Sequence, residues 1–289
     1  MKNYIIINNK ILPEEKALIS VKDRGFRFGD GVFETCLISN QIIYNWQAHL
    51  IRLKTGLEAI KIKFNKRNFG KNIQQSCCQL IKKNKIENGY LRIAISRGVG
   101  SVGYLPLKNI QPTIVIETFN LTPKPKPPIK LWVSKIEKPS AKSLPINYKL
   151  MNGINSTLVK MEAIENGCFD GIILNNKKQI CETSSANIFW IKNDVLYTPR
   201  QDCGYLQGTI REKIISLSSV ETGPINIKLV KAKLDNLLNA DEVFITNVAL
   251  GVLSVDQIEN VKFKNKKYGK VFADLLSQDI KIYTSECKN

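Results

Sequence analysis

Three chemically useful features follow one another between residues 145 and 212. Lys149 precedes an amphipathic segment, Glu182 ends a short apolar stretch, and GYLQGTIRE (204–212) has the form of a turn that opens a helix. A lysine amine can form a Schiff base with an aldehyde, and a carboxylate can pair with a protonated ring nitrogen. The N–H groups at a helix start bind phosphate. Together these are the groups needed to hold pyridoxal phosphate.

Each of these residues alone has an ordinary structural explanation. A lysine before a helix is usually a solvated helix end, and a single glutamate is usually a surface charge. The order and wording of the motifs carry more information. Three stretches resemble the pyridoxal-phosphate enzymes of fold type IV: ETSSANIFW (182–190), GYLQGTIR (204–211) and TNVALG (246–251). That family includes branched-chain aminotransferases, D-amino acid aminotransferases and 4-amino-4-deoxychorismate lyases, and the resemblance covers about residues 4–258.

The resemblance implies an α/β (α+β) protein with two domains and the cofactor between them. We expect a small N-terminal α/β domain over 1–119 and a larger C-terminal α/β domain over 131–289 that carries the pyridoxal-phosphate lysine. The prolines of NLTPKPKPPIK favour extended chain, so 120–130 is predicted to be the interdomain linker. The family also implies a homodimer.

Hydrophobic periodicity predicts the main elements. Helices are expected over 46–62 and 66–83, and strands over 89–98 and 112–119. A further helix is predicted over 152–166. Its apolar side, on which Met161 is expected to be a core residue, consists of Ile154, Leu158, Met161 and Ile164.

The resemblance assigns roles to the cofactor-binding residues. Lys149 is the catalytic lysine, and Glu182 is the partner of the pyridine nitrogen. Arg52, in the H-L-x-R-L wording of 49–53, binds the cofactor phosphate, a role that suits a planar guanidinium. His49 is expected to support it. The remaining contacts are Leu206 against the ring, the backbone N–H groups of Thr209 and Ile210 at the phosphate, and backbone donors around Asn247 and Val248.

The substrate side departs from the family's pattern. Phe33 is expected to line the substrate pocket, although an inward-facing core residue explains it equally well. SRGVGSVGYLP (96–106) resembles the R-G-x-G-x-R-G-Y loop of the lyases, and Tyr104 keeps its tyrosine. Val102 stands where the second arginine is expected, so Arg97 or a lysine from elsewhere must bind the substrate carboxylate. Asn152 is expected to support the lysine loop.

Two enzymatic reactions remain open at this point. Lyase chemistry on 4-amino-4-deoxychorismate, which serves folate biosynthesis, is favoured by GYLP, NIFW, YTPR and the Thr-Asn pair near 246–247. The alternative is an aminotransferase acting on branched-chain or D-amino acids with 2-oxoglutarate. Gly153 replaces the tyrosine that branched-chain enzymes usually carry, and Val248 replaces a threonine of many transaminases. A binding protein that merely kept the fold is disfavoured by the set Lys149, Glu182 and Arg52.

Composition excludes several other classes. The 289 residues are 43% hydrophobic and 24% charged, as in ordinary globular proteins. The net charge of +18 comes from scattered lysines, so we expect an anionic amino-acid-like substrate and no nucleic-acid partner. No apolar run is long enough for a membrane span. A single histidine and the lack of a C-x-x-C pair argue against a metal site, and seven cysteines without a signal peptide favour the cytoplasm.

Overall fold

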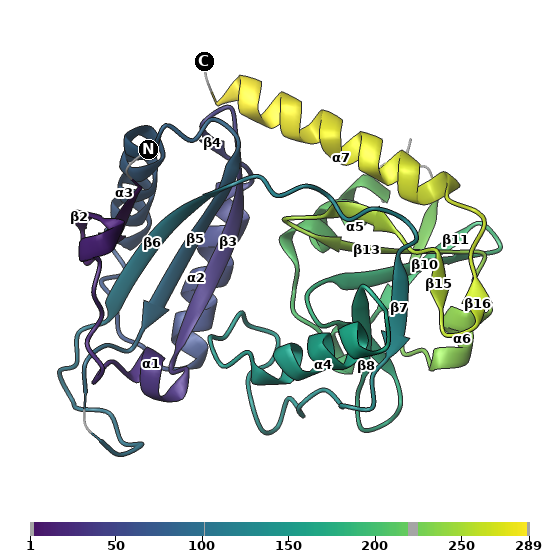
Figure 1. The fold of residues 1–289 in the computed structure, drawn as a ribbon, viewed down its shortest axis with the longest axis horizontal. Helices are drawn as coiled ribbons and strands as arrows, with labels where there is room; N and C mark the ends of the chain where they lie inside the picture. The colour runs from purple at the N-terminus through teal and green to yellow at the C-terminus, as the bar shows by residue number, and fades with distance from the viewer. Residues whose placement is uncertain (1–2, 101, 219–224, 288–289) are drawn as a thin grey trace. The chain divides into compact units, whose positions relative to one another are not determined.

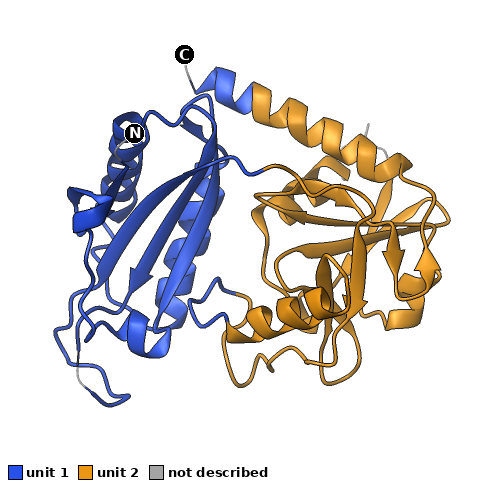
Figure 2. Cartoon of the chain, viewed as in Figure 1, with its two compact units in different colours: residues 1–122, 148–153, 282–289 blue, residues 123–147, 154–281 orange. Residues whose placement is uncertain are grey.

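The computed structural model describes residues 3–100, 102–218 and 225–287. The chain divides into two compact units (Figure 2). The described residues of 1–122, 148–153 and 282–289 form the first unit, and those of 123–147 and 154–281 form the second. The change of unit after Thr122 falls inside the predicted linker.

The first unit is a six-stranded antiparallel sheet with helices on one face (Figure 1). The strand order is β2-β1-β6-β5-β3-β4. Its strands are β1 Tyr4–Ile7, β2 Lys10–Pro13, β3 Gly31–Ser39, β4 Ile42–Ile43, β5 Gly89–Ser96 and β6 Thr113–Asn120. Its helices are the 3-10 turn η1 Glu14–Lys16, α1 Arg24–Phe28, α2 Trp46–Ala59 and α3 Phe69–Asn84.

Alternation of buried and less buried residues from Val32 to Ser39 of β3 and from Leu91 to Ile95 of β5 gives this sheet two different faces, since successive side chains of a strand point to opposite sides. One face joins α2 and α3 in a buried core. Core members from the strands include Val32, Cys36, Leu91, Ile93 and Ile95, and those from the helices include Leu50, Leu53, Leu57, Leu80 and Ile81. The residues between them on each strand, such as Phe33 and Arg92, lie on the opposite face.

The lysine segment belongs to the first unit, which corrects the expectation that the C-terminal domain carries it. Residues 148–153 lie with the first unit although they are separated from it in sequence. Val32 and Leu150 form an antiparallel bridge beside β3. Because β3 is one strand of the large sheet, these backbone hydrogen bonds attach the segment to the N-terminal unit.

The second unit contains two five-stranded mixed sheets (Figure 1). One has the order β12-β11-β10-β13-β14, and the other has the order β16-β15-β7-β8-β9. The first five are β10 Asn187–Lys192, β11 Val195–Pro199, β12 Asn226–Val230, β13 Glu242–Asn247 and β14 Gly251–Ser254. The others are β7 Lys130–Val133, β8 Asp170–Leu174, β9 Ile180–Thr183, β15 Gln257–Ile258 and β16 Val261–Lys262.

The helices that begin in this unit are α4 Ile154–Glu165, α5 Thr209–Ser218, α6 Leu234–Leu238 and α7 Lys267–Glu286, with the 3-10 turn η2 Gln201–Cys203 before α5. Buried Glu242 accepts hydrogen bonds from the N–H groups of Tyr268 (2.9 Å) and Gly269 (2.5 Å), which satisfies the first turn of α7.

The buried side of α4 differs from the expected one. Val159 and Ala163 are its buried residues, whereas the predicted apolar side is exposed. Met161 is therefore a surface residue in this unit. Gly171 explains the choice: a Cβ there would overlap Val159, so β8 and α4 approach each other closely along the side with small or β-branched residues. The exposed apolar residues are Ile154, Leu158, Met161 and Ile164.

The mixed α/β class predicted from the sequence is confirmed. Within the described residues, no helix has both the length and the apolar character to cross a membrane.

Candidate cofactor site

Lys149 is held beside the edge of β3 at Gly31–Phe33 by backbone hydrogen bonds. The Phe33 N–H donates to the Lys149 carbonyl (2.9 Å), and the Met151 N–H donates to the Gly31 carbonyl (2.9 Å). The Lys149 ammonium lies 4.4 Å from the centre of the Phe33 ring. A cation at this distance is attracted by the ring. The register with β3 therefore fixes the direction in which Lys149 presents its amine.

The turn before β3 also packs on the lysine segment. Gly29 has a φ of +63°, which favours glycine, and a Cβ there would lie 3.0 Å from the Asn152 Cα. The predicted support of this loop by Asn152 stays a prediction, because the contact observed is the close packing of Asn152 against Gly29. The asparagine side chain itself is exposed.

Arg92 shares the Phe33 ring with Lys149. Its guanidinium carbon lies 4.5 Å from the ring centre, and Arg92 is an exposed residue of β5. Sequence reasoning identified this stretch only as a strand. Alternation carried the missing signal, because Arg92 stands between core residues Leu91 and Ile93 and so must face the side of Phe33. The structure thus places two cations beside the predicted substrate-lining aromatic.

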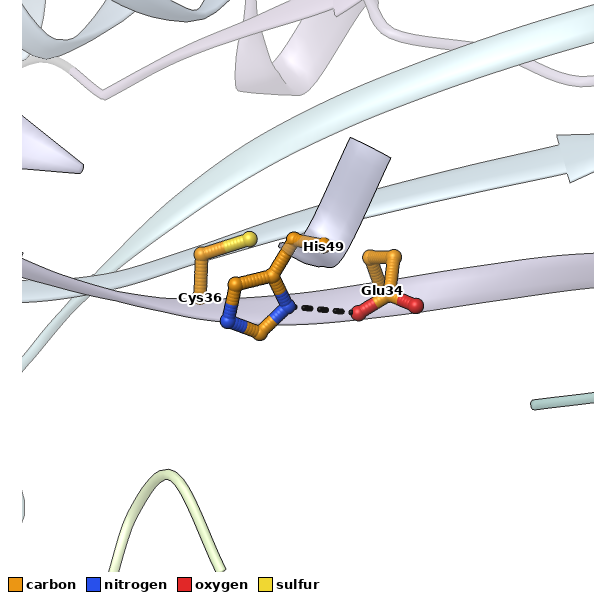
Figure 3. Close-up of side chains that lie close together, drawn as sticks. All are labelled: Glu34, Cys36 and His49. Atoms are coloured by element: carbon orange, nitrogen blue, oxygen red, sulfur yellow. Dashed lines mark hydrogen bonds and ion pairs between the residues drawn. The ribbon is translucent and has the colours of Figure 1, made fainter. Parts of the chain in front are cut away.

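On the opposite face of β3, Glu34 forms a buried network with α2. Arg52 donates from Nε to Glu34 Oε1 (2.7 Å) and from Nη2 to Oε2 (2.7 Å). His49 Nδ1 lies 2.8 Å from Glu34 Oε2 (Figure 3). The Glu34 side chain is 1% exposed. The bidentate pair supplies the charge compensation that a buried carboxylate requires.

The same network sets the pKa values of its members. Burial alone would raise the pKa of Glu34, but the Arg52 charge and the hydrogen bonds from Arg52 and His49 lower it to about 2. Burial lowers the pKa of His49, and Glu34 only partly opposes this effect. The network at neutral pH is therefore a carboxylate, a guanidinium and a neutral imidazole.

Glu34, Cys36 and His49 bring a carboxylate, a thiol and an imidazole within 4.8 Å of one another (Figure 3). This combination resembles a set of metal ligands. However, Arg52 already binds both carboxylate oxygens, and burial followed by the Glu34 charge raises the pKa of the Cys36 thiol well above its usual range. A cation would have to displace the guanidinium and ionise that thiol. We therefore interpret the cluster as a support for Arg52.

Arg97 has a structural role that accounts for its charge. It donates from Nε and Nη2 to the two carboxylate oxygens of Asp30 (2.7 and 2.8 Å). It also donates to the carbonyls of Ile60 (2.7 Å) and Lys61 (3.0 Å), just beyond the end of α2. These bonds tie α2 to the start of β3. They count against the predicted use of Arg97 as the substrate's carboxylate partner.

The loop after Arg97 is anchored by buried Arg24, which donates to the carbonyls of Gly103 (2.8 Å) and Tyr104 (2.7 Å). Val102 and Tyr104 are 83% and 85% exposed. The predicted contact of Tyr104 with substrate stays a prediction.

In the second unit, Glu182 is a buried carboxylate with fixed partners. Lys138 Nζ lies 2.5 Å from Oε1, and the Leu206 N–H donates to Oε2 (3.1 Å). The Asn187 side chain donates to the Leu206 carbonyl (2.8 Å) and lies 3.5 Å from Glu182 Oε2. The turn that carries Leu206 is thus attached to Glu182 directly. Sequence reasoning missed Lys138 and Asn187.

Buried Asp170 organises the turn that follows Glu182. It accepts hydrogen bonds from the hydroxyls of Thr183 (2.9 Å), Ser184 and Ser185 (2.9 Å). The Asn247 side chain then donates to the Ser185 carbonyl (3.0 Å). The hydroxyls of ETSS therefore act as structural donors, and they connect this turn to the end of β13.

The start of α5 has the features expected of an anion site. A Cβ at Gly208 would overlap the Asn187 side chain, so only glycine lets the backbone approach there. The Arg211 Nε and the Thr246 hydroxyl are buried and have no hydrogen-bond partner among the described residues. Buried polar groups are normally satisfied, so these donors fit a bound phosphate-bearing ligand. Thr209 and Ile210 open the helix, as predicted.

These features fit pyridoxal phosphate, and comparison with known proteins identifies the class. The sequence profile of the family described as "Amino-transferase class IV" matches residues 31–258. The chain therefore belongs to the class IV aminotransferase family and is a pyridoxal-phosphate-dependent enzyme. The resemblance stated from the sequence is confirmed.

Individual relatives span several activities. The aminodeoxychorismate lyase of Bacillus subtilis is 28% identical over 99% of this chain and 95% of its own length. A protein of Methanocaldococcus jannaschii, provisionally named a branched-chain-amino-acid aminotransferase, is 29% identical over 96% of this chain and 99% of its own length. Branched-chain amino acid aminotransferase from Escherichia coli has the same fold, with a TM-score of 0.87, 24% identity and coverage of 96% and 92% of the two chains. The predicted fold type is confirmed.

The Glu34–Arg52 pair generates a prediction about stability. Glu34→Gln should lower the free energy of unfolding at pH 7 by roughly 3–5 kcal/mol, because it leaves the Arg52 charge buried without its carboxylate. The Glu34 contribution is fully present above its ordinary pKa of 4.5 and is lost as the pH falls toward about 2. Urea unfolding of both proteins at several pH values should therefore show the difference shrinking below pH 4.5.

Glu58→Gln is the matched control, because the Glu58–Lys66 pair (2.6 Å) is exposed. It should change stability by no more than about 0.5 kcal/mol. Equal effects of the two substitutions at pH 7 would contradict the buried network.

Proposed function

We propose that this enzyme is a 4-amino-4-deoxychorismate lyase that releases 4-aminobenzoate and pyruvate, and that it serves folate biosynthesis in the cytoplasm. The observation that carries the choice of reaction is the position of Asn247. Its side chain donates to Ser185 and accepts from the Leu250 N–H (2.7 Å), so the Thr-Asn turn typical of the lyases is part of the site's framework. The B. subtilis lyase, similar over nearly the whole chain, supports this choice.

Pyridoxal phosphate supplies the electron sink for the reaction. Lys149 would hold the cofactor through its aldehyde, and its amine would move the proton of the amine-bearing carbon and donate a proton to the departing enol-ether oxygen of the substrate. Glu182 would keep the ring nitrogen protonated. Leu206 would pack on the ring, while Arg52, the α5 start and the Asn247–Val248 backbone would bind the phosphate.

Arg92 is the residue that we propose as the carboxylate partner of the substrate. It is exposed and stacks on the same ring as Lys149, whereas Arg97 is committed to Asp30 and two carbonyls. A guanidinium fixed on an aromatic face loses little freedom when it binds a carboxylate. This assignment answers the question that Val102 raised.

Arg92→Met should therefore raise the KM for the anionic substrate on the order of ten- to a hundredfold, the cost of one charge-assisted hydrogen bond. Cofactor absorbance and the unfolding midpoint should stay unchanged. Steady-state kinetics of Arg92→Met and of Arg67→Met, an exposed arginine elsewhere in the unit, give the comparison. An unchanged KM in Arg92→Met would remove this residue from the site.

The enzyme is proposed to act as a homodimer. The first unit exposes apolar side chains on residues 18–26 and on residues 102–105, and the Gly100 N–H donates to the Lys22 carbonyl (3.2 Å) between these two stretches. The most exposed of the described side chains there are Leu18, Val21, Phe26, Val102, Tyr104 and Leu105. Apolar surfaces of this kind mark protein contacts.

Light scattering should give twice the chain mass for the native protein. The double variant Val21→Asp, Leu105→Asp should give the mass of one chain, because a charge on an apolar contact surface opposes association. A monomeric native protein would contradict the proposal.

The decisive experiment separates the lyase from the alternative, an aminotransferase acting on branched-chain or D-amino acids. Aminodeoxychorismate alone should yield 4-aminobenzoate and pyruvate, because elimination needs no amino acceptor. Leucine or D-alanine with 2-oxoglutarate should react slowly or not at all. Fast transamination without 4-aminobenzoate would reverse the choice.

Borohydride reduction followed by peptide mapping is the control for the shared chemistry. The reduced adduct should lie on Lys149, and Lys149→Ala should abolish both turnover and labelling. An adduct on another lysine would exclude both reactions as written.

A further inference from the structure

The buried carboxylate of Glu182 forms an ion pair with the buried ammonium of Lys138. Neither the sequence motifs nor the family comparison gave Lys138 a role. The side chains of Lys138 and Glu182 are 10% and 8% exposed, and Nζ and Oε1 are 2.5 Å apart. The two oxygens of Glu182 have different partners, since Oε2 accepts from the Leu206 N–H. The carboxylate is therefore fixed in both position and orientation.

Lys138 is held in place from its backbone outward. The residues after β7 continue along β8, where the Ser134 N–H donates to the Ile172 carbonyl (3.0 Å) and the Lys138 N–H donates to the Leu174 carbonyl (2.8 Å). The Lys138 stem then passes beside Gly204, where a Cβ would lie 3.9 Å from Lys138 Cγ. Gly204 precedes the turn that supplies the Leu206 N–H.

Among the described residues, Lys138 is the one cation that forms an ion pair with Glu182. The neighbouring thiol of Cys181 stays neutral, because burial and then the Glu182 charge raise its pKa far above the ordinary value. Burial also raises the pKa of Cys203. The nearby Glu137–Lys178 pair is exposed and self-compensated. A buried carboxylate that loses its paired cation is costly, because its charge is then left uncompensated away from water.

We propose that Lys138 is a positioning residue that presents Glu182, charged and correctly oriented, to the ring nitrogen of pyridoxal phosphate. This inference rests on the proposed role of Glu182. Lys138 acts through Glu182 and does not itself touch the ring. We therefore expect Lys138 to raise the affinity only for a ligand that has a ring nitrogen, and only in a protein that has the Glu182 carboxylate.

The test measures the dissociation constants of two probes by equilibrium dialysis: pyridoxal phosphate, and an analogue in which C–H replaces the ring nitrogen. Lys138→Met should weaken pyridoxal phosphate on the order of tenfold, the usual effect of one charge-assisted interaction, and should leave the analogue's Kd unchanged. Lys138→Arg should restore most of the affinity, since a guanidinium also pairs with a carboxylate. In a Glu182→Gln background, Lys138→Met should have no further effect.

A purely structural lysine would weaken both probes equally or act additively with Glu182→Gln, and either result overturns the proposal. Unchanged or tighter binding of pyridoxal phosphate by Lys138→Met does so as well. Thermal unfolding of the same samples shows whether the variants are folded, and Lys138→Arg keeps the test valid if Lys138→Met is not. Failure of the native protein to bind pyridoxal phosphate would instead contradict the proposed function itself.

Discussion

The hydrogen bond from the Phe33 N–H to the Lys149 carbonyl is the constraint on which the catalytic half of the first unit depends. This bond aligns the Lys149 segment with β3, although the two are more than a hundred residues apart in sequence. Because a strand alternates its faces, this register puts Lys149 over Phe33 while the next residue, Glu34, points into the core toward Arg52. β3 therefore places the Phe33 ring beside the Lys149 amine on one face and the Glu34–Arg52 pair against α2 on the other.

Three buried carboxylates show three ways of meeting the cost of removing a charge from water. Glu34 has a bidentate arginine and a neutral histidine. Asp170 accepts hydrogen bonds from three hydroxyls and from the Gly171 N–H, and these bonds fix a turn. Glu182 has an ammonium on one oxygen and a backbone N–H on the other.

The arginines of the substrate side show why charge alone does not assign function. Arg97 stands in the loop motif, yet its donors are used by Asp30 and by carbonyls beyond α2. Arg92 lies in a stretch with no motif, yet it faces the same ring as Lys149. The difference comes from what surrounds each guanidinium: Arg97 donates to a carboxylate and two backbone carbonyls, whereas Arg92 is exposed on an aromatic face.

Periodicity and motif order were sufficient for the mixed α/β class, for most helices and strands, and for the family to which the chain belongs. These features are local, since hydrophobic spacing, glycine at a turn and the residues around Glu182 are read within a short window. The attachment of Lys149 to the first unit, the exposed side of α4, the commitment of Arg97 and the pairing of Lys138 with Glu182 were decided only by the tertiary structure. Each depends on strand pairing or on close packing between residues distant in sequence, and such partners leave no spacing pattern in the chain.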